Sequence, residues 1–216
     1  MGAPLIFDVE GTLIDCATQT ITAWQEVLAE HGRHFTHQDL HRYSGMDGKM
    51  MLRRLLADSN DGLIETLVKE QGHRYSEKFL PEVLPFSDTT TIVAALARHH
   101  RIALATSCNR KELDVYLKRL DITEHVVAAV CGDDVKEGKP SPQLLLAALA
   151  ALRKVEATGT PIAIGDTPFD AEAAKSAKAV SVGICTGGFS REALLGAGFS
   201  SVVADLHGLL EQIKGN

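Results

Sequence analysis

The chain lacks the features that mark several large classes of protein. It has no block of lysines and arginines, and its net charge is −6, so we expect no nucleic-acid partner. No apolar stretch approaches the roughly 20 residues that a membrane-spanning helix needs, so we expect no membrane partner either. An anionic ligand would therefore need local positive charge or a metal ion.

Signals for secretion and for zinc binding are also missing. The first residues, MGAPLIFD, enter a strand pattern without a basic leader, a following apolar run and a cleavage site. The four cysteines are scattered, with no C-x-x-C pair and no histidine at zinc spacing. We therefore predict a cytoplasmic protein with reduced thiols, most of them in the core.

What is present is the composition of a folded protein, with 45% apolar and 23% charged residues. Short runs rich in Val, Ile, Leu and Ala recur without alternation, as in parallel strands that are covered on both faces. From residue 88 onward these runs alternate with helical segments, which predicts a doubly wound α/β fold. The predicted strands are 4–9, 101–106, 126–131, 161–166, 179–184 and 201–204, and the predicted helices are 89–99, 109–119, 141–153, 168–177 and 205–214.

The segment between the first two predicted strands has apolar residues at helical spacing and no strand pattern. A plain crossover connection needs only one helix, so we predict that residues 16–87 form an inserted helical domain. The segment PEVLPF (81–86) closes the insertion, and its two prolines suit a hinge. Residues 1–15 and 88–216 are then the core domain.

Polar residues follow three of the predicted strands. Asp8 and Glu10 follow the first strand, Thr106 and Ser107 follow the second, and Asp166 follows PIAIG. Because ligands of open parallel sheets bind beyond the carboxyl ends of the strands, we expect these side chains to converge on one site. Two carboxylates this close repel each other by roughly 1 kcal/mol in water and by more in a poorly solvated cleft. The pattern therefore indicates that something else is bound there.

Two further charged residues stand near predicted helix starts. Lys139 precedes a proline, which biases it toward an extended conformation, and Ser141 and Pro142 have the residue types of a helix cap and first position. Asp170 lies four residues after Asp166 in GDTPFD. The same segment matches a T-x-x-D capping box, so a site role and a capping role for Asp170 are both open.

Taken in order, the segments DVEGT, ATS, GKP and GDTPFD resemble the motifs of the haloacid dehalogenase-like hydrolases. The resemblance is to the subgroup of helical-cap phosphatases and β-phosphoglucomutase-like proteins, and it covers nearly the whole chain. Each motif alone is weak, but their order, their places at strand ends and the helical insertion together make a strong signal. The resemblance implies a Rossmann-like core with a helical cap, and Mg²⁺-dependent hydrolysis of a small phosphorylated substrate by a monomer or homodimer.

Carried over residue by residue, the resemblance gives each acid a role. Asp8 is the nucleophile that forms an aspartyl-phosphate. Glu10 protonates the leaving alcohol, then activates water, and binds the metal through its backbone carbonyl. Asp8 and Asp166 supply further oxygen ligands to Mg²⁺, with Asp170 beside them.

The remaining roles concern the phosphoryl group and the rest of the substrate. The resemblance implies that Thr106 and Lys139 hold phosphoryl oxygens and that Lys139 also screens the charge of Asp8. The predicted substrate-binding residues are Gly11, Lys49, Ser107 and Asn109.

One residue departs from the family pattern, because Glu10 stands where the family usually has Asp. A Glu at this position resembles the enolase-phosphatases, which carry a similar D-x-E-G-T. Because Glu is one methylene longer than Asp, its carboxyl group can be displaced, and a misplacement of about 1 Å can lower a rate 10²-fold. Three alternatives therefore stay open: a phosphosugar mutase, a phosphonate hydrolase in which Lys49 forms an imine, and a catalytically impaired binding protein. A lysine in such a place is more often a solvated helix residue, and this interpretation of Lys49 stays open beside the functional one.

Overall fold

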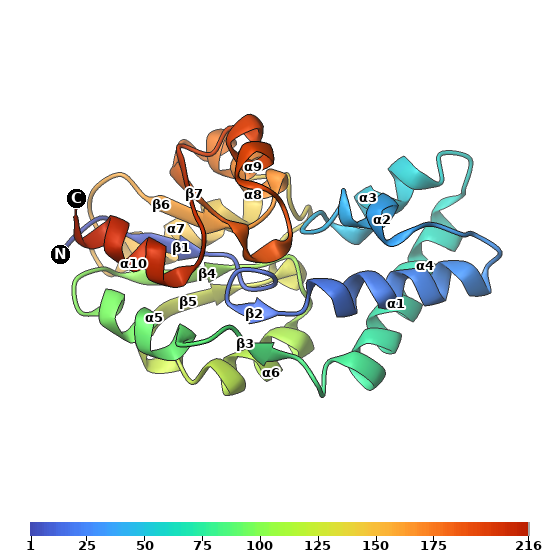
Figure 1. Cartoon of the computed structure of the whole chain (residues 1–216), viewed down its shortest axis with the longest axis horizontal. Coiled ribbons are helices and arrows are strands. Elements are labelled where there is room, and N and C mark those ends of the chain that lie inside the picture. The colour runs from blue at the N-terminus through green and yellow to red at the C-terminus, as the bar shows by residue number, and fades with distance from the viewer. Residues whose placement is uncertain (216) are drawn as a thin grey trace.

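The computed structural model describes residues 1–215 and contains a six-stranded parallel sheet in the order β5-β4-β1-β6-β7-β8 (Figure 1). β1 lies at the centre, where Ile6 pairs in register with Ala103 of β4 and Ala163 of β6. The predicted doubly wound α/β fold is therefore confirmed. The strands are β1 (Leu5–Phe7), β4 (Ile102–Ala105), β5 (Val126–Val130), β6 (Ile162–Gly165), β7 (Val180–Ile184) and β8 (Ser201–Val203).

Alternate residues of the central strand bury opposite faces of the sheet. Leu5 and Phe7 pack against helices α5 (Thr89–Ala97), α6 (Arg110–Leu120) and α10 (Leu206–Lys214). Ile6 faces the other way, toward α7 (Gln143–Lys154) and α8 (Pro168–Ser176). Coverage on both faces explains why the strand sequences are continuously apolar.

The helical region between β1 and β4 has an apolar core of its own. Its helices are α1 (Ala17–Glu30), α2 (His37–His41), α3 (Gly48–Leu55) and α4 (Asp61–Arg74), and a π-helical turn (Tyr75–Phe79) continues α4. Trp24, Leu28, Leu52 and Leu67 are buried together in this region, which extends to one side of the sheet in Figure 1. The exact boundaries of a separate domain, residues 16–87, stay a prediction.

The two connections to the helical region run side by side. β2 (Ile14–Asp15) pairs antiparallel with β3 (Leu84–Pro85), so the chain enters and leaves the region through one short ribbon. The sequence gives no alternating pattern for two strands of this length, and neither was predicted.

Two other local expectations differ from the structure. A short helix, α9 (Arg191–Ala197), lies between β7 and β8, where no helix was predicted; Ser190 caps it and Gly198 ends it at φ +106°. The predicted cap at Ser141 is wrong by one residue, because Pro142 occupies the cap position of α7 and offers no side-chain acceptor. The amide of Ser141 instead donates to the carbonyl of Gly138 at 3.0 Å.

The cysteines follow the prediction, since Cys16, Cys108 and Cys131 are buried as free thiols and Cys185 is half-buried. Among residues 1–215, no helix has both the length and the apolar character that crossing a membrane would require.

Candidate active site

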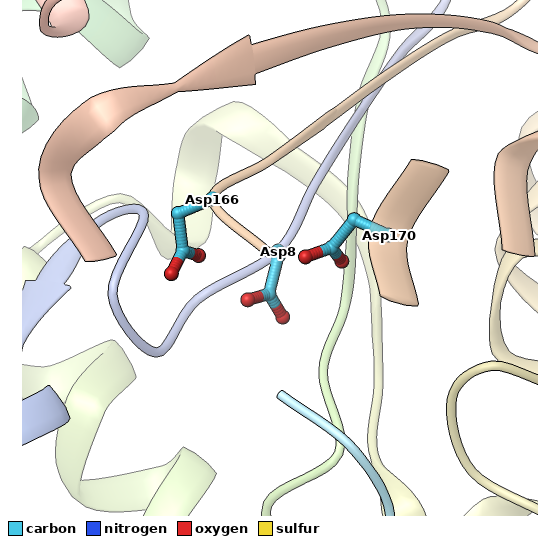
Figure 2. A group of neighbouring side chains, drawn as sticks. All are labelled: Asp8, Asp166 and Asp170. Carbon is cyan, nitrogen blue, oxygen red and sulfur yellow. The ribbon is translucent and has the colours of Figure 1, made fainter. Parts of the chain in front are cut away.

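Three carboxyl groups meet at the carboxyl ends of the central strands. Asp8 follows β1, Asp166 follows β6, and Asp170 lies in the first turn of α8. All three are buried, and their nearest oxygens lie within 4.8 Å of one another. Figure 2 shows Asp8 between the other two, with the carboxyl group of Asp170 directed toward it.

Lys139 supplies a buried positive charge to this cluster. Its Nζ lies 2.5 Å from Asp8 Oδ1 and 2.7 Å from Asp170 Oδ1, and its side chain is only 2% exposed. Burial opposes the charge, but Asp170 and Asp8 outweigh it and raise the pKa of Lys139 above its usual range. Lys139 is therefore a permanent cation held between two carboxylates.

One lysine does not balance three carboxylates. Burial raises the pKa of Asp8 to about 6, with Lys139 opposing the rise and Asp170 adding to it. Burial, with the charges of Asp8 and Asp170, also raises the pKa of Asp166 well above its usual range. The raised pKa values mean that the charged forms of these acids are poorly compensated by Lys139 alone, and a divalent cation bound by their hard oxygen donors would favour the charged forms.

Two glycines leave room for the carboxylate of Asp166 on the side where the backbone approaches it. A Cβ atom at Gly187 would lie 1.8 Å from Asp166 Oδ2, and one at Gly11, where φ is +79°, would lie 2.3 Å from it. Thr12 Oγ1 donates to Asp166 Oδ1 at 2.6 Å. These contacts fix Asp166 in place, so the residues present fit a metal site.

Asp170 combines both roles that the sequence left open. Its Oδ2 accepts from the Thr167 amide at 3.0 Å and from Thr167 Oγ1 at 2.7 Å, which completes the capping box of α8. Its Oδ1 faces Lys139 and belongs to the carboxylate cluster. Capping therefore orients Asp170 without removing it from the site.

Most of the predicted site residues line one or both of two adjoining spaces. A cavity of about 50 Å³ lies beside the carboxylates, and a larger pocket of about 910 Å³ lies between the sheet and the helical region. Glu10 and Ser107 line both spaces. The small cavity is also lined by Asp8, Gly11, Lys139 and Asp166, and the large pocket by Lys49 and Asn109.

Three predicted residues lie away from the small cavity or interact with other parts of the protein. Thr106 is buried and lines neither space, although it directly follows β4. Asn109 Oδ1 accepts from the amide of Glu112 as the cap of α6. Lys49 Nζ is half-exposed and lies 3.9 Å from Glu65, so this side chain is partly solvated as well as pocket-lining.

The helical region covers the cluster through contacts made by a loop and a helix. The Asp47 amide donates to the carbonyl of Lys139 at 2.9 Å, and Ser107 Oγ donates to the carbonyl of Gly45 at 3.3 Å. His41 Nε2 lies 2.9 Å from the carbonyl of Gly187. These bonds place the loop before α3 directly over the ends of the strands.

Sequence reasoning missed the surroundings of Glu10. Tyr116 donates to Glu10 Oε1 at 3.1 Å, and the hydroxyls of Tyr116 and Tyr75 lie 2.6 Å apart. Burial raises the pKa of Glu10 to about 8; Glu112 and Asp8 add to the rise, and Tyr116 opposes it. Neither tyrosine belongs to a motif, so the sequence carried no signal for them. Thr12, which donates to Asp166, lies within DVEGT, and its role could have been predicted from that motif.

Fold and site together define a class: a doubly wound α/β enzyme with an acidic site at the carboxyl end of its sheet, covered by a helical region. The chain belongs to the haloacid dehalogenase-like hydrolase family, whose model matches residues 5–184. Solved structures of the β-phosphoglucomutase type from Bacteroides vulgatus and Thermotoga maritima share its fold, with TM-scores of 0.82 and 0.70 at 17% and 24% identity.

Individual relatives agree with this assignment. A phosphorylated carbohydrates phosphatase of Thermotoga maritima is 31% identical over 80% of each chain. A phosphoglycolate phosphatase of Agrobacterium fabrum is 26% identical over 84% of this chain and 80% of its own. The crystal structure of a hydrolase from Pseudomonas syringae superposes with a TM-score of 0.89 at 30% identity and covers 99% of both chains.

Proposed function

We propose that the chain is a Mg²⁺-dependent phosphate-monoester hydrolase that acts on a small phosphorylated metabolite through an aspartyl-phosphate at Asp8. The observation that carries this proposal is the Asp8 carboxylate, which lines a cavity at the end of β1 while Lys139 Nζ lies 2.5 Å away. The names of the relatives support the substrate class, since they act on phosphorylated carbohydrates and on phosphoglycolate.

The metal site uses the carboxylate cluster. Asp8, Asp166 and the backbone carbonyl of Glu10 would hold the ion, with Asp170 as a further carboxylate of the same cluster. When bound, Mg²⁺ supplies positive charge that offsets the carboxylates and draws electron density from the phosphoryl group.

Asp8 and Lys139 then prepare the attack on phosphorus. Lys139 neutralises part of the charge on Asp8 and offers N–H donors to the phosphoryl oxygens. Thr106 directly follows β4 but is buried and lines neither space, so Lys139 carries this role in the proposal. An Asp8 oxygen attacks phosphorus, the bond from phosphorus to the ester oxygen breaks, and the aspartyl-phosphate forms.

Glu10 acts as an acid when this intermediate forms and as a base when it breaks down. It gives its proton to the departing alkoxide, and its carboxylate then takes a proton from the water that attacks phosphorus. That second attack releases phosphate and returns Asp8 as a carboxylate. The position of Glu10 supports this role, since it lines both the cavity beside Asp8 and the larger pocket.

The larger pocket is the proposed site for the rest of the substrate. Residues 16–87 act as a cap over it, and Gly11, Ser107, Asn109 and Lys49 contact the substrate. The volume of about 910 Å³ is at the upper end of the range of about 300–1,000 Å³ typical of small-molecule sites. A phosphonate hydrolase is less favoured, because the half-exposed Lys49 is paired with Glu65 and not buried as an imine-forming lysine requires.

A screen of phosphorylated metabolites with Mg²⁺, read as phosphate release, tests the proposal. Asp8→Asn is the matched control, since it keeps the shape of the side chain and removes the nucleophile. We expect phosphate release from at least one sugar phosphate or phosphoglycolate by the unaltered protein, and its loss in Asp8→Asn. Activity of Asp8→Asn within tenfold of the unaltered protein would show that Asp8 is not the nucleophile.

A further inference from the structure

A pair of buried tyrosine hydroxyls links the helical region to Glu10. Tyr116 lies in α6, which packs against one face of the sheet, and it is 0% exposed. Tyr75 begins the π-helical turn that follows α4 and is 2% exposed. Buried tyrosines normally direct their hydroxyl groups at a polar partner. Here the two hydroxyls are 2.6 Å apart, and Tyr116 also reaches Glu10 Oε1 at 3.1 Å.

The direction of these bonds follows from counting protons. A tyrosine hydroxyl has one proton to donate, and Tyr116 donates it to Glu10 Oε1. Tyr75 is therefore the donor to Tyr116. Since Oε1 is an acceptor in this chain of bonds, Glu10 Oε2 is the oxygen left to carry and release a proton.

A glutamate at this position needs such an anchor more than an aspartate would. The additional methylene adds a torsion, and fixing a free Glu side chain can cost up to about 1.5–2 kcal/mol of conformational entropy. Glu112 lies close enough to repel the charged form of Glu10. A donor on a rigid helix offsets both effects.

We propose that Tyr116, oriented by Tyr75, is a positioning residue that fixes Glu10 Oε1 and directs its other carboxyl oxygen, Oε2, toward the leaving group. The inference rests on the proposed function of Glu10 as an acid. It adds two residues that act through Glu10: Tyr116 lines neither the small cavity nor the larger pocket, whereas Tyr75 also lines the larger pocket.

The test compares kcat/KM for two substrates of nearly the same shape, p-nitrophenyl phosphate and phenyl phosphate. The first has a good leaving group and the second needs protonation, and kcat/KM reports events through the first irreversible step. We expect Tyr116→Phe to lower kcat/KM for phenyl phosphate by about tenfold or more and for p-nitrophenyl phosphate by less than about threefold. In a Glu10→Gln background the same substitution should change neither value by more than about twofold.

Thr90→Val is the matched control, because Thr90 Oγ1 donates to the carbonyl of Leu120 at the end of the same helix, α6. It removes a half-buried hydroxyl that anchors α6 without approaching Glu10, so the ratio between the two substrates should stay as in the unaltered protein. Should Tyr116→Phe fail to fold, Tyr75→Phe gives the measurement, with a loss of about threefold expected for phenyl phosphate alone.

Equal losses on both substrates, additive losses in the Glu10→Gln background, or no loss at all would overturn the inference. Other results would contradict the proposed function itself: Glu10→Gln would hydrolyse phenyl phosphate as fast as the unaltered protein, or the unaltered protein would hydrolyse neither substrate. Either result also removes the basis for a positioning role.

Discussion

Replacing Lys139 by methionine isolates the role of the buried cation. Methionine keeps an unbranched side chain of similar length and removes the charge that lies 2.5 Å from Asp8 and 2.7 Å from Asp170. Breaking a buried ion pair by removing one partner costs about 3–5 kcal/mol, because the remaining charges are left uncompensated. For a chain of 216 residues, about 2–4 °C of melting temperature corresponds to each kcal/mol, so we expect a decrease of about 6–20 °C.

The pH dependence of this loss identifies its cause. Burial already raises the pKa of Asp8 from 3.8 to about 6, and the pKa rises further without Lys139. A carboxyl whose pKa is raised on folding stabilises the fold below its unfolded pKa, and that contribution disappears as the pH rises through the folded pKa. Lys139→Met should therefore lose more stability near pH 8 than near pH 5, and Mg²⁺ should restore part of it near pH 8.

Thermal unfolding followed by circular dichroism, with and without Mg²⁺, measures both effects. Lys118→Met, an exposed lysine of α6, is the control and should melt within about 2 °C of the unaltered protein. The reasoning is refuted if Lys139→Met melts as the control does, or if its loss is the same at both pH values.

Three further perturbations test other parts of the site. Excess chelator should abolish phosphate release and Mg²⁺ should restore it; full activity in chelator would contradict a metal-dependent reaction. Burial raises the pKa of Glu112 from 4.5 to about 7, so the charged side chain destabilises the fold above pH 7. Glu112→Gln should therefore raise the free energy of unfolding by up to about 3 kcal/mol above pH 7 and by little at pH 4.5, as measured by denaturant unfolding. A benefit that is independent of pH would mean that Glu112 is not ionising in the fold. Lys49→Ala should raise KM for the best metabolite found and leave p-nitrophenyl phosphate hydrolysis within about twofold, because Lys49 is expected to contact only the distal part of the substrate; a similar loss on both would place it nearer the phosphoryl group.

Much of the fold follows from local patterns. The apolar runs at Leu5–Phe7, Ile102–Ala105 and Ile162–Gly165 are strands because parallel strands buried on both faces need continuous apolar residues. The same patterns place Asp8 and Asp166 at the carboxyl ends of neighbouring strands, and the structure brings them together. The two-residue strands β2 and β3 were missed because segments this short carry no periodicity.

Sequence by itself thus determined the parallel sheet, the helical insertion and the acids at the strand ends, since each depends on the spacing of apolar and polar residues along the chain. Only the tertiary structure decided that Lys139 forms ion pairs with both Asp8 and Asp170, and that Tyr116 donates a hydrogen bond to Oε1 of Glu10. Tyr116 and Glu10 are 106 positions apart, and Tyr75 and Tyr116 are 41 apart. No local pattern encodes such contacts, because they exist only when separate elements pack against one another.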